Sequence, residues 1–136
     1  EVTRFYEEVN NSRNNQLLID CPEDSTIITD PNMLKVILRN LIDNAIKYTM
    51  NGKISLIYKL EQGRKVIYVT DTGRGMNDKM VSQLNLYFTS NEDLGNEYQG
   101  NFGIKIIKDF VSYLNAAIEI KSTINGGTQF KLSFTN

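Results

Sequence analysis

Two amphipathic helical patterns, each followed by a pair of strand patterns, constrain the fold of this chain more than any other feature. Apolar residues recur at spacings of three and four over about 31–49 and about 102–115, which is typical of helices with one buried face. Six β-rich runs bounded by turn-forming residues cover 16–20, 25–29, 53–60, 65–71, 117–122 and 128–134. Because regular strand–helix–strand alternation is absent, we expect a two-layer α/β sandwich, with a mixed, mostly antiparallel sheet and helices on one face.

Both helices have a defined apolar face. Asp30 and Pro31 are typical of an N-cap and a first helical residue, and the Asn51-Gly52 pair predicts where the first helix ends. Its expected apolar face consists of Leu34, Ile37, Leu38, Leu41, Ile42, Ala45 and Ile46. The expected face of the second helix consists of Phe102, Ile106, Ile107, Phe110, Val111 and Leu114.

Composition narrows the class of protein. A chain of 136 residues with 40% hydrophobic and 23% charged residues is typical of a single globular domain over 1–136. The net charge of −1 provides no basic field for nucleic acid, and no apolar run approaches the length of a membrane span. The single cysteine, Cys21, excludes an internal disulfide. These values favour an ordinary globular domain with no nucleic-acid partner.

The chain contains no histidine. This rules out a Ser–His triad, a His-ligated zinc site and an internal histidine that acts as acid, base or phosphate acceptor. The chain begins at Glu1 and its first methionine is Met33, so we expect it to be a piece of a longer protein. A short helix is expected at its start, over 1–15.

Three polar residues of the first helix, Asn40, Asn44 and Lys47, lie within an arc of about 60° beside the apolar stripe, whereas Asp43 points to water. The two carboxamide oxygens could ligate a hard cation while the lysine meets an anion. A solvated helix margin explains the same residues, so the pattern alone leaves both interpretations open.

Glycines mark two further candidate sites. Asp71 follows a strand and could accept a hydrogen bond from an exocyclic amine, while Gly73 and Gly75 could let a flat ligand approach the backbone. An ordinary turn is the alternative. Gly100 and Gly103 could expose helix N-terminal amides to a phosphate, or could only let the chain turn into the helix.

The long polar stretch 72–101 contains one weak helical pattern, at 77–86. A stretch of this length without regular structure is typical of a functional lid. It lacks the Lys-Ser/Thr pair of a P-loop and the third glycine of a protein-kinase glycine loop.

Taken in order, several short segments resemble one family. They are NLIDNAIKYT (40–49), DTGRGM (71–76), YF (87–88), GNFGIKI (100–106) and GGTQF (126–130). Together they resemble the catalytic and ATP-binding domain of sensor histidine kinases, in the GHKL ATPase superfamily. The resemblance covers the chain from Gln16 onward and implies a Bergerat fold, with ATP held between the two helices under the 72–101 lid.

The resemblance also implies residue roles. Asn44 would ligate Mg²⁺, Asn40 would touch the phosphates or a metal-bound water, and Lys47 would pair with a phosphate, which makes these three the catalytic residues. Asp71 would accept from the adenine amine. The expected nucleotide-binding residues are Asn40, Asn44, Lys47, Tyr48, Asp71, Gly73, Gly75, Met76, Phe88, Gly100, Phe102, Gly103 and Thr128.

The implied function is to donate the γ-phosphoryl of ATP to a histidine on a separate dimerisation domain of the same protein, which would precede the 1–15 helix. A response regulator would act downstream. The isolated domain would be a cytoplasmic monomer unable to phosphorylate itself on histidine, and its parent would be anchored in the membrane.

Two alternatives remain. The segment Gln99–Gly103 departs from the family's GxGLGL pattern, which favours a non-catalytic ATP-sensing module. An anti-sigma-type serine kinase is similarly small. Topoisomerase and mismatch-repair ATPases fit less well, because they place a catalytic acid in the first helix and Asp43 points away.

Overall fold

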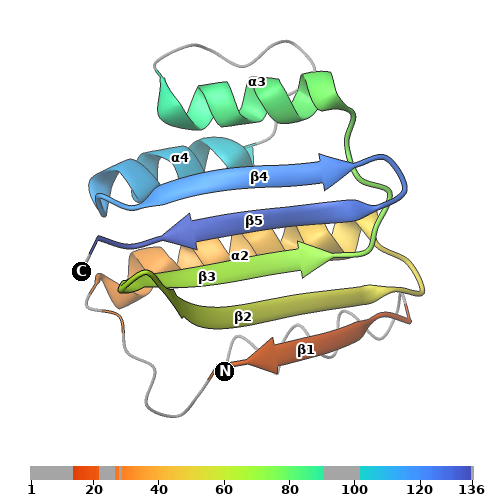
Figure 1. The fold of residues 1–136 in the computed structure, drawn as a ribbon, viewed down its shortest axis with the longest axis horizontal. Coiled ribbons are helices and arrows are strands. Elements are labelled where there is room, and N and C mark those ends of the chain that lie inside the picture. The colour runs from red at the N-terminus through yellow and green to blue at the C-terminus, as the bar shows by residue number, and fades with distance from the viewer. Residues whose placement is uncertain (1–13, 22–26, 28, 91–101, 136) are drawn as a thin grey trace.

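The computed structural model describes residues 14–21, 27, 29–90 and 102–135, with five strands and three helices (Figure 1). In chain order these are β1 (Gln16–Asp20), α2 (Pro31–Tyr48), β2 (Lys53–Glu61), β3 (Arg64–Asp71), α3 (Asp78–Thr89), α4 (Phe102–Tyr113), β4 (Ala117–Thr123) and β5 (Gly127–Ser133). None of the helices in this part of the chain combines the length and the hydropathy that crossing a membrane requires.

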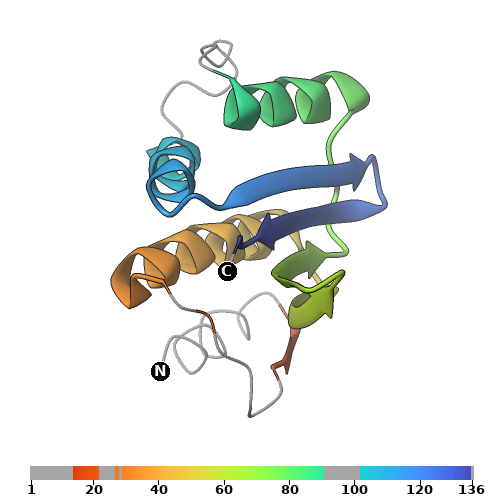
Figure 2. The same cartoon turned by 60° about the vertical axis from the view of Figure 1, so that its left-hand side comes forward.

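The strands form one mixed sheet in the order β1-β2-β3-β5-β4. β1 pairs parallel with β2, and the other neighbours pair antiparallel. Helices α2 and α4 lie on one face of this sheet (Figure 2). The predicted α/β sandwich is therefore confirmed. Of the strand expected over 25–29, only Ile27 and Thr29 are described and neither is in a strand, and the helix expected over 1–15 lies almost entirely outside the described residues.

Helix α2 follows its sequence signals closely. The Asp30 side chain caps it by accepting from the backbone N–H groups of Asn32 and Met33, at 2.9 and 3.1 Å. The helix ends at the C-cap Thr49, whose backbone is extended, and Asn51 in the following turn has a φ of 56°. Its buried residues are Ile37, Leu41, Ile42, Ala45 and Ile46, all on the predicted face.

Helix α4 buries most of the predicted face, since Ile107 and Val111 are buried and Phe110 and Leu114 pack against the core, but it differs at Ile104 and Ile106. Ile104, Ile107 and Val111 are buried in the core, whereas Ile106 is 36% exposed, so its predicted burial is wrong. The buried residues recur at spacings of three and four, and Ile106 is turned about 100° away from Ile107 around the helix axis. The side chain of Phe102 lies outside the described residues.

Helix α3 occupies much of the range that we expected to be a lid. Asn77 caps its start by accepting from the backbone N–H of Met80 at 2.8 Å, and Leu84 is buried in the core. Asn85 exchanges two hydrogen bonds with the backbone of Ile120 in the edge strand β4, at 2.9 and 3.0 Å. The helical pattern predicted at 77–86 is therefore confirmed as α3, which runs beside β4 (Figure 2). Residues 91–101 lie outside the described part, and the role of the 72–101 range as a lid stays a prediction.

Candidate functional site

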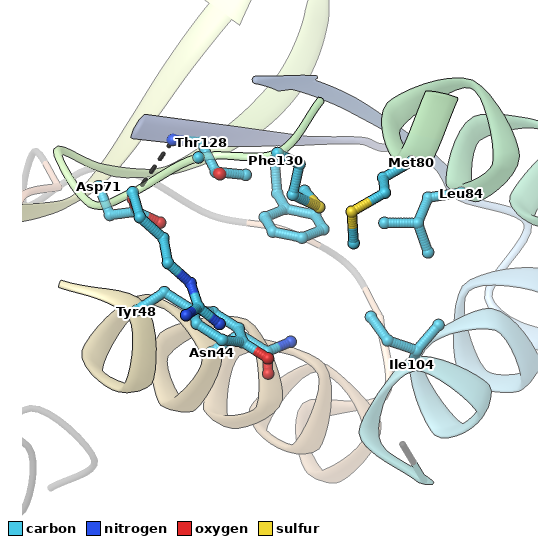
Figure 3. Close-up of a pocket in the computed structure, with 11 residues that line it drawn as sticks. Asn44, Tyr48, Asp71, Met80, Leu84, Ile104, Thr128 and Phe130 are labelled. Carbon is cyan, nitrogen blue, oxygen red and sulfur yellow. Dashed lines mark hydrogen bonds between the residues drawn. The ribbon is translucent and has the colours of Figure 1, made fainter. Parts of the chain in front are cut away.

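A pocket of about 220 Å³ lies between the C-terminal half of α2, the adjoining ends of β3 and β5, and the helices α3 and α4 (Figure 3). The predicted site residues that line it are Asn44, Tyr48, Asp71, Gly75, Met76 and Thr128. Its walls also include residues that the sequence did not single out, namely Arg74, Met80, Leu84, Ile104 and Phe130.

Asp71, the last residue of β3, is a buried carboxyl at the polar end of this pocket. Its Oδ1 accepts from the backbone N–H groups of Gly73, at 2.8 Å, and Thr128, at 3.2 Å (Figure 3 marks the second bond). Desolvation by burial raises the pKa of Asp71, while these two bonds and the hydroxyl of Thr49 act to lower it. The backbone therefore fixes one carboxylate oxygen, and neither of the two amide donors uses Oδ2.

The glycines after Asp71 are required by the protein's own backbone. A Cβ at Gly73 would meet the carbonyl oxygen of Tyr48, and a Cβ at Gly75, whose φ is +69°, would meet the carbonyl oxygen of Thr123. Both glycines thus have a packing role that the sequence did not reveal. Gly75 lines the pocket and Gly73 does not.

The C-terminal end of α2 contributes an aromatic ring flanked by cations. The Arg74 guanidinium carbon lies 4.4 Å from the centre of the Tyr48 ring, and the Lys47 ammonium lies 5.3 Å from it. Asn44, one turn earlier on α2, lines the pocket beside Tyr48 (Figure 3). This side of the pocket therefore combines positive charge with a carboxamide, which suits an anion and a hard cation.

The opposite wall is apolar. Met80 and Leu84 from α3 and Ile104 from α4 line it, and Phe130 from β5 extends the apolar surface toward Asp71 (Figure 3). A planar ring could pack its apolar face on this wall while an amine on the edge of the ring meets the carboxyl of Asp71.

Among the described residues, the predicted site residues Asn40, Lys47, Phe88 and Gly103 do not line this pocket. Asn40 is half-buried and its Nδ2 donates to the Val36 carbonyl at 2.9 Å, which uses the amide's donor end. Phe88 is half-buried and packs against the core, with its ring 5.7 Å from that of Tyr87. Gly103 is half-buried in the first turn of α4. Gly100 and the Phe102 side chain lie outside the described residues, so their roles stay predictions.

The residues at this pocket can supply only part of the ligands of a magnesium ion. Within residues 14–21, 27, 29–90 and 102–135, no group of three Asp, Glu or Cys side chains is placed to hold a metal. Mg²⁺ that accompanies a nucleotide is held mainly by phosphates and waters and needs only one or two protein oxygens. The carboxamide of Asn44 can supply one such oxygen at the pocket wall.

Comparison with known proteins identifies the family. A sequence model of the family described as "Histidine kinase-, DNA gyrase B-, and HSP90-like ATPase" matches residues 29–136. The autoinducer 2 sensor kinase/phosphatase LuxQ of Vibrio vulnificus is 34% identical over 127 residues, which is 88% of this chain and 14% of LuxQ. The sensor protein kinase GraS of Staphylococcus aureus is 26% identical over 117 residues, which is 85% of this chain and 34% of GraS. The chain thus spans a minor part of these relatives.

Solved structures share the fold. The catalytic domain of the histidine kinase ThkA superposes with a TM-score of 0.79 at 20% identity, covering 98% of this chain and 86% of that one. Full-length ShkA in complex with AMPPNP gives a TM-score of 0.80 at 20% identity, covering 98% of this chain and 28% of ShkA. The chain therefore belongs to the family of histidine kinase-, DNA gyrase B- and HSP90-like ATPases and is homologous to the sensor kinases of two-component systems.

Proposed function

We propose that this chain binds Mg·ATP in the pocket beside Asp71 and donates the γ-phosphoryl group to a histidine on a separate dimerisation domain of the same protein. The observation that carries the proposal is the buried carboxyl of Asp71, held by two backbone amides at the end of a pocket with one apolar wall. Besides these amides and the Thr49 hydroxyl, the carboxylate has acceptor capacity left for a donor group on a ligand. The exocyclic amine of adenine is a donor of the required kind.

The adenine ring would lie along the apolar wall. Met76 lines the pocket, Phe130 extends toward Asp71, and Thr128 is paired with Asp71 across the β3–β5 ladder (Figure 3). The Thr128 hydroxyl is 2.9 Å from the hydroxyl of Ser122, so it is held within a local network. These contacts would orient the base and exclude water from the Asp71 carboxylate.

The triphosphate would extend toward the C-terminal half of α2. Asn44 would supply a carboxamide oxygen to Mg²⁺, Asn40 would contact a phosphate or a water of the metal shell, and Lys47 would pair with a phosphate. When bound, Mg²⁺ neutralises charge that develops on the transferred phosphoryl group. Phosphoryl transfer depends mainly on positioning and charge neutralisation, so these residues need not act as nucleophiles.

The phosphate acceptor would be outside this chain. The sequence contains no histidine, and the chain spans only 14% of LuxQ and 34% of GraS, which are sensor kinases. We propose that the parent protein supplies the histidine and a response regulator receives the phosphoryl group. The domain would act in the cytoplasm, where ATP is available.

Nucleotide binding is tested first, by calorimetry with ATP in the presence and absence of Mg²⁺. Wild type should bind ATP more tightly with Mg²⁺ present. Asp71→Ala should lose binding, and Asn44→Ala should weaken it chiefly in the presence of Mg²⁺. Asp43→Ala is the matched control, because Asp43 is exposed on the same helix as Asn44. Equal ATP affinity in wild type and Asp71→Ala would refute the adenine assignment.

Phosphoryl transfer is tested by mixing the chain with the parent's histidine-bearing dimerisation fragment and ATP labelled at the γ-phosphate. Acid-labile label on that fragment is the expected result, since phosphohistidine is hydrolysed in acid. Acid-stable label would indicate a serine kinase instead. ATP binding without any transfer would favour an ATP-sensing module.

A further inference from the structure

Arg74 is held against the nucleotide pocket by contacts on both sides. Its backbone N–H donates to the carbonyl of Tyr48 at 3.2 Å, and its own carbonyl accepts from the N–H of Asn125 at 2.8 Å. Its side chain then lies over the Tyr48 ring, with the guanidinium carbon 4.4 Å from the ring centre. The backbone and the stacking contact together fix where this cation sits.

The stacked guanidinium keeps its donors available. In the part of the chain that the structure describes, no carboxylate lies within ion-pair distance of Arg74, which is exposed. A cation–π contact does not use the five N–H donors of a guanidinium as hydrogen bonds would. The group is always charged, so it presents a fixed positive edge to whatever occupies the pocket.

The place of Arg74 in the pocket indicates which part of a bound ligand it would contact. Asp71 lies at the end that suits an amine donor, and Arg74 reaches from there to the α2 side, where Asn44 and Tyr48 line the wall. The Lys47 ammonium lies 5.3 Å from the centre of the same Tyr48 ring. Two cations thus lie around the Tyr48 ring, on the α2 side of the pocket where Asn44 also lines the wall.

We propose that Arg74 binds the polyphosphate of the nucleotide, with the Tyr48 ring as the platform that orients its guanidinium. This inference rests on the proposed ATP site and adds a specificity-determining residue to it. A planar guanidinium can give two parallel hydrogen bonds to a phosphate, and holding it in advance reduces the entropy lost on binding. Arg74 would therefore make the site prefer nucleoside polyphosphates over the bare nucleoside.

The test compares ATP, ADP and adenosine as ligands for wild type and Arg74→Gln by calorimetry. Arg74→Gln should weaken ATP binding about tenfold, the lower end of the effect of losing a charged hydrogen bond, while adenosine binding stays unchanged. Arg64→Gln is the matched control: it removes the same charge from the first residue of β3, which does not line this pocket. Thermal unfolding of both variants checks that the fold is retained.

Two outcomes would overturn the inference. Unchanged ATP affinity in Arg74→Gln would show that Arg74 does not contact the phosphates. A parallel loss of ATP and adenosine affinity would show that it only shapes the pocket. Neither outcome resembles failure of the proposed function, in which wild type itself would not bind ATP.

Discussion

Replacing Asp71 with asparagine separates the structural role of this side chain from its role in binding. The Oδ1 atom of Asp71 accepts from the amides of Gly73 and Thr128, and an asparagine Oδ1 can accept both bonds in the same place. The NH₂ group of the new carboxamide then stands where Oδ2 was. Asp71→Asn therefore keeps the local backbone contacts but places a donor where the carboxylate offers an acceptor.

Asp71→Asn should raise the free energy of unfolding at neutral pH. Burial raises the pKa of Asp71 above its usual value of 3.8, which means that the folded state favours the uncharged carboxyl. The stabilising contribution of this group is present below the unfolded pKa and is lost as the pH rises through the folded pKa. At neutral pH the ligand-free Asp71→Asn variant, which carries no charge at this position, should be more stable than wild type, and this gain should disappear in acid.

The affinity for ATP, in contrast, should fall in Asp71→Asn. A hydrogen bond to a charged acceptor contributes about 1.5–3 kcal/mol, which corresponds to a roughly ten- to hundredfold change in the dissociation constant. In Asp71→Asn the adenine amine would also face another donor, so we expect a loss of about a hundredfold. Inosine triphosphate carries a carbonyl in place of that amine, so the preference of wild type for ATP over inosine triphosphate should shrink in the variant.

The assay combines urea unfolding at neutral and acid pH with calorimetric titration of both nucleotides. Asp43→Asn serves as the control, since Asp43 is exposed on α2 and its substitution should change neither quantity. The reasoning is refuted if Asp71→Asn binds ATP as tightly as wild type does. It is equally refuted if the variant loses stability at neutral pH, because burial of the charge would then not be the dominant effect.

Three further predictions concern packing and pH. In urea unfolding, Gly75→Ala should lower the free energy of unfolding more than Gly63→Ala does. Both glycines have a positive φ, at which a side chain costs about 1–2 kcal/mol, but only the Cβ added at Gly75 would also meet a backbone carbonyl. Asn85→Ala should cost about 1–3 kcal/mol in the same assay, because both backbone groups of Ile120 lose their bonds to α3; an unchanged midpoint would contradict this. In calorimetry, the affinity for adenosine should fall in acid as Asp71 becomes protonated. Because burial raises the pKa of Asp71, this fall should begin at a higher pH than for an ordinary aspartate, and Asp71→Asn should show no pH dependence of adenosine affinity.

The elements of the fold were largely predictable because their signals are local. The Asp30 cap, the spacing of apolar residues in α2 and the turn residues between strands act within a few positions, and the structure has these elements close to their predicted bounds. The buried face of α4 was harder to assign, because apolar residues lie on several sides of that helix. Which of Ile104 and Ile106 is buried depends on α2 and β4, which pack against the helix.

The pocket lining was predictable where residue chemistry is unusual and where the family resemblance names a position, as it does for Tyr48, Gly75, Met76 and Thr128. Asp71 and Asn44 were found because a carboxyl after a strand and an amide beside an apolar stripe require an explanation. Met80 and Phe130 carry ordinary apolar side chains, and they reach the pocket through tertiary packing that no local pattern encodes. Arg74 was overlooked for a related reason, since its contact with Tyr48 joins residues that are distant in sequence.

Titration of the ¹⁵N-labelled chain with Mg·ATP, followed by amide chemical shifts, tests the central claim most directly. We expect the largest shifts at the amides of Gly73 and Thr128, which donate to the Asp71 carboxylate, and of Gly75, which lines the pocket. The amides of Gln62 and Gly63, in the turn at the opposite end of β3, should not move. Shifts centred on that turn, or no shifts with saturating Mg·ATP, would contradict the assignment of this pocket as the nucleotide site.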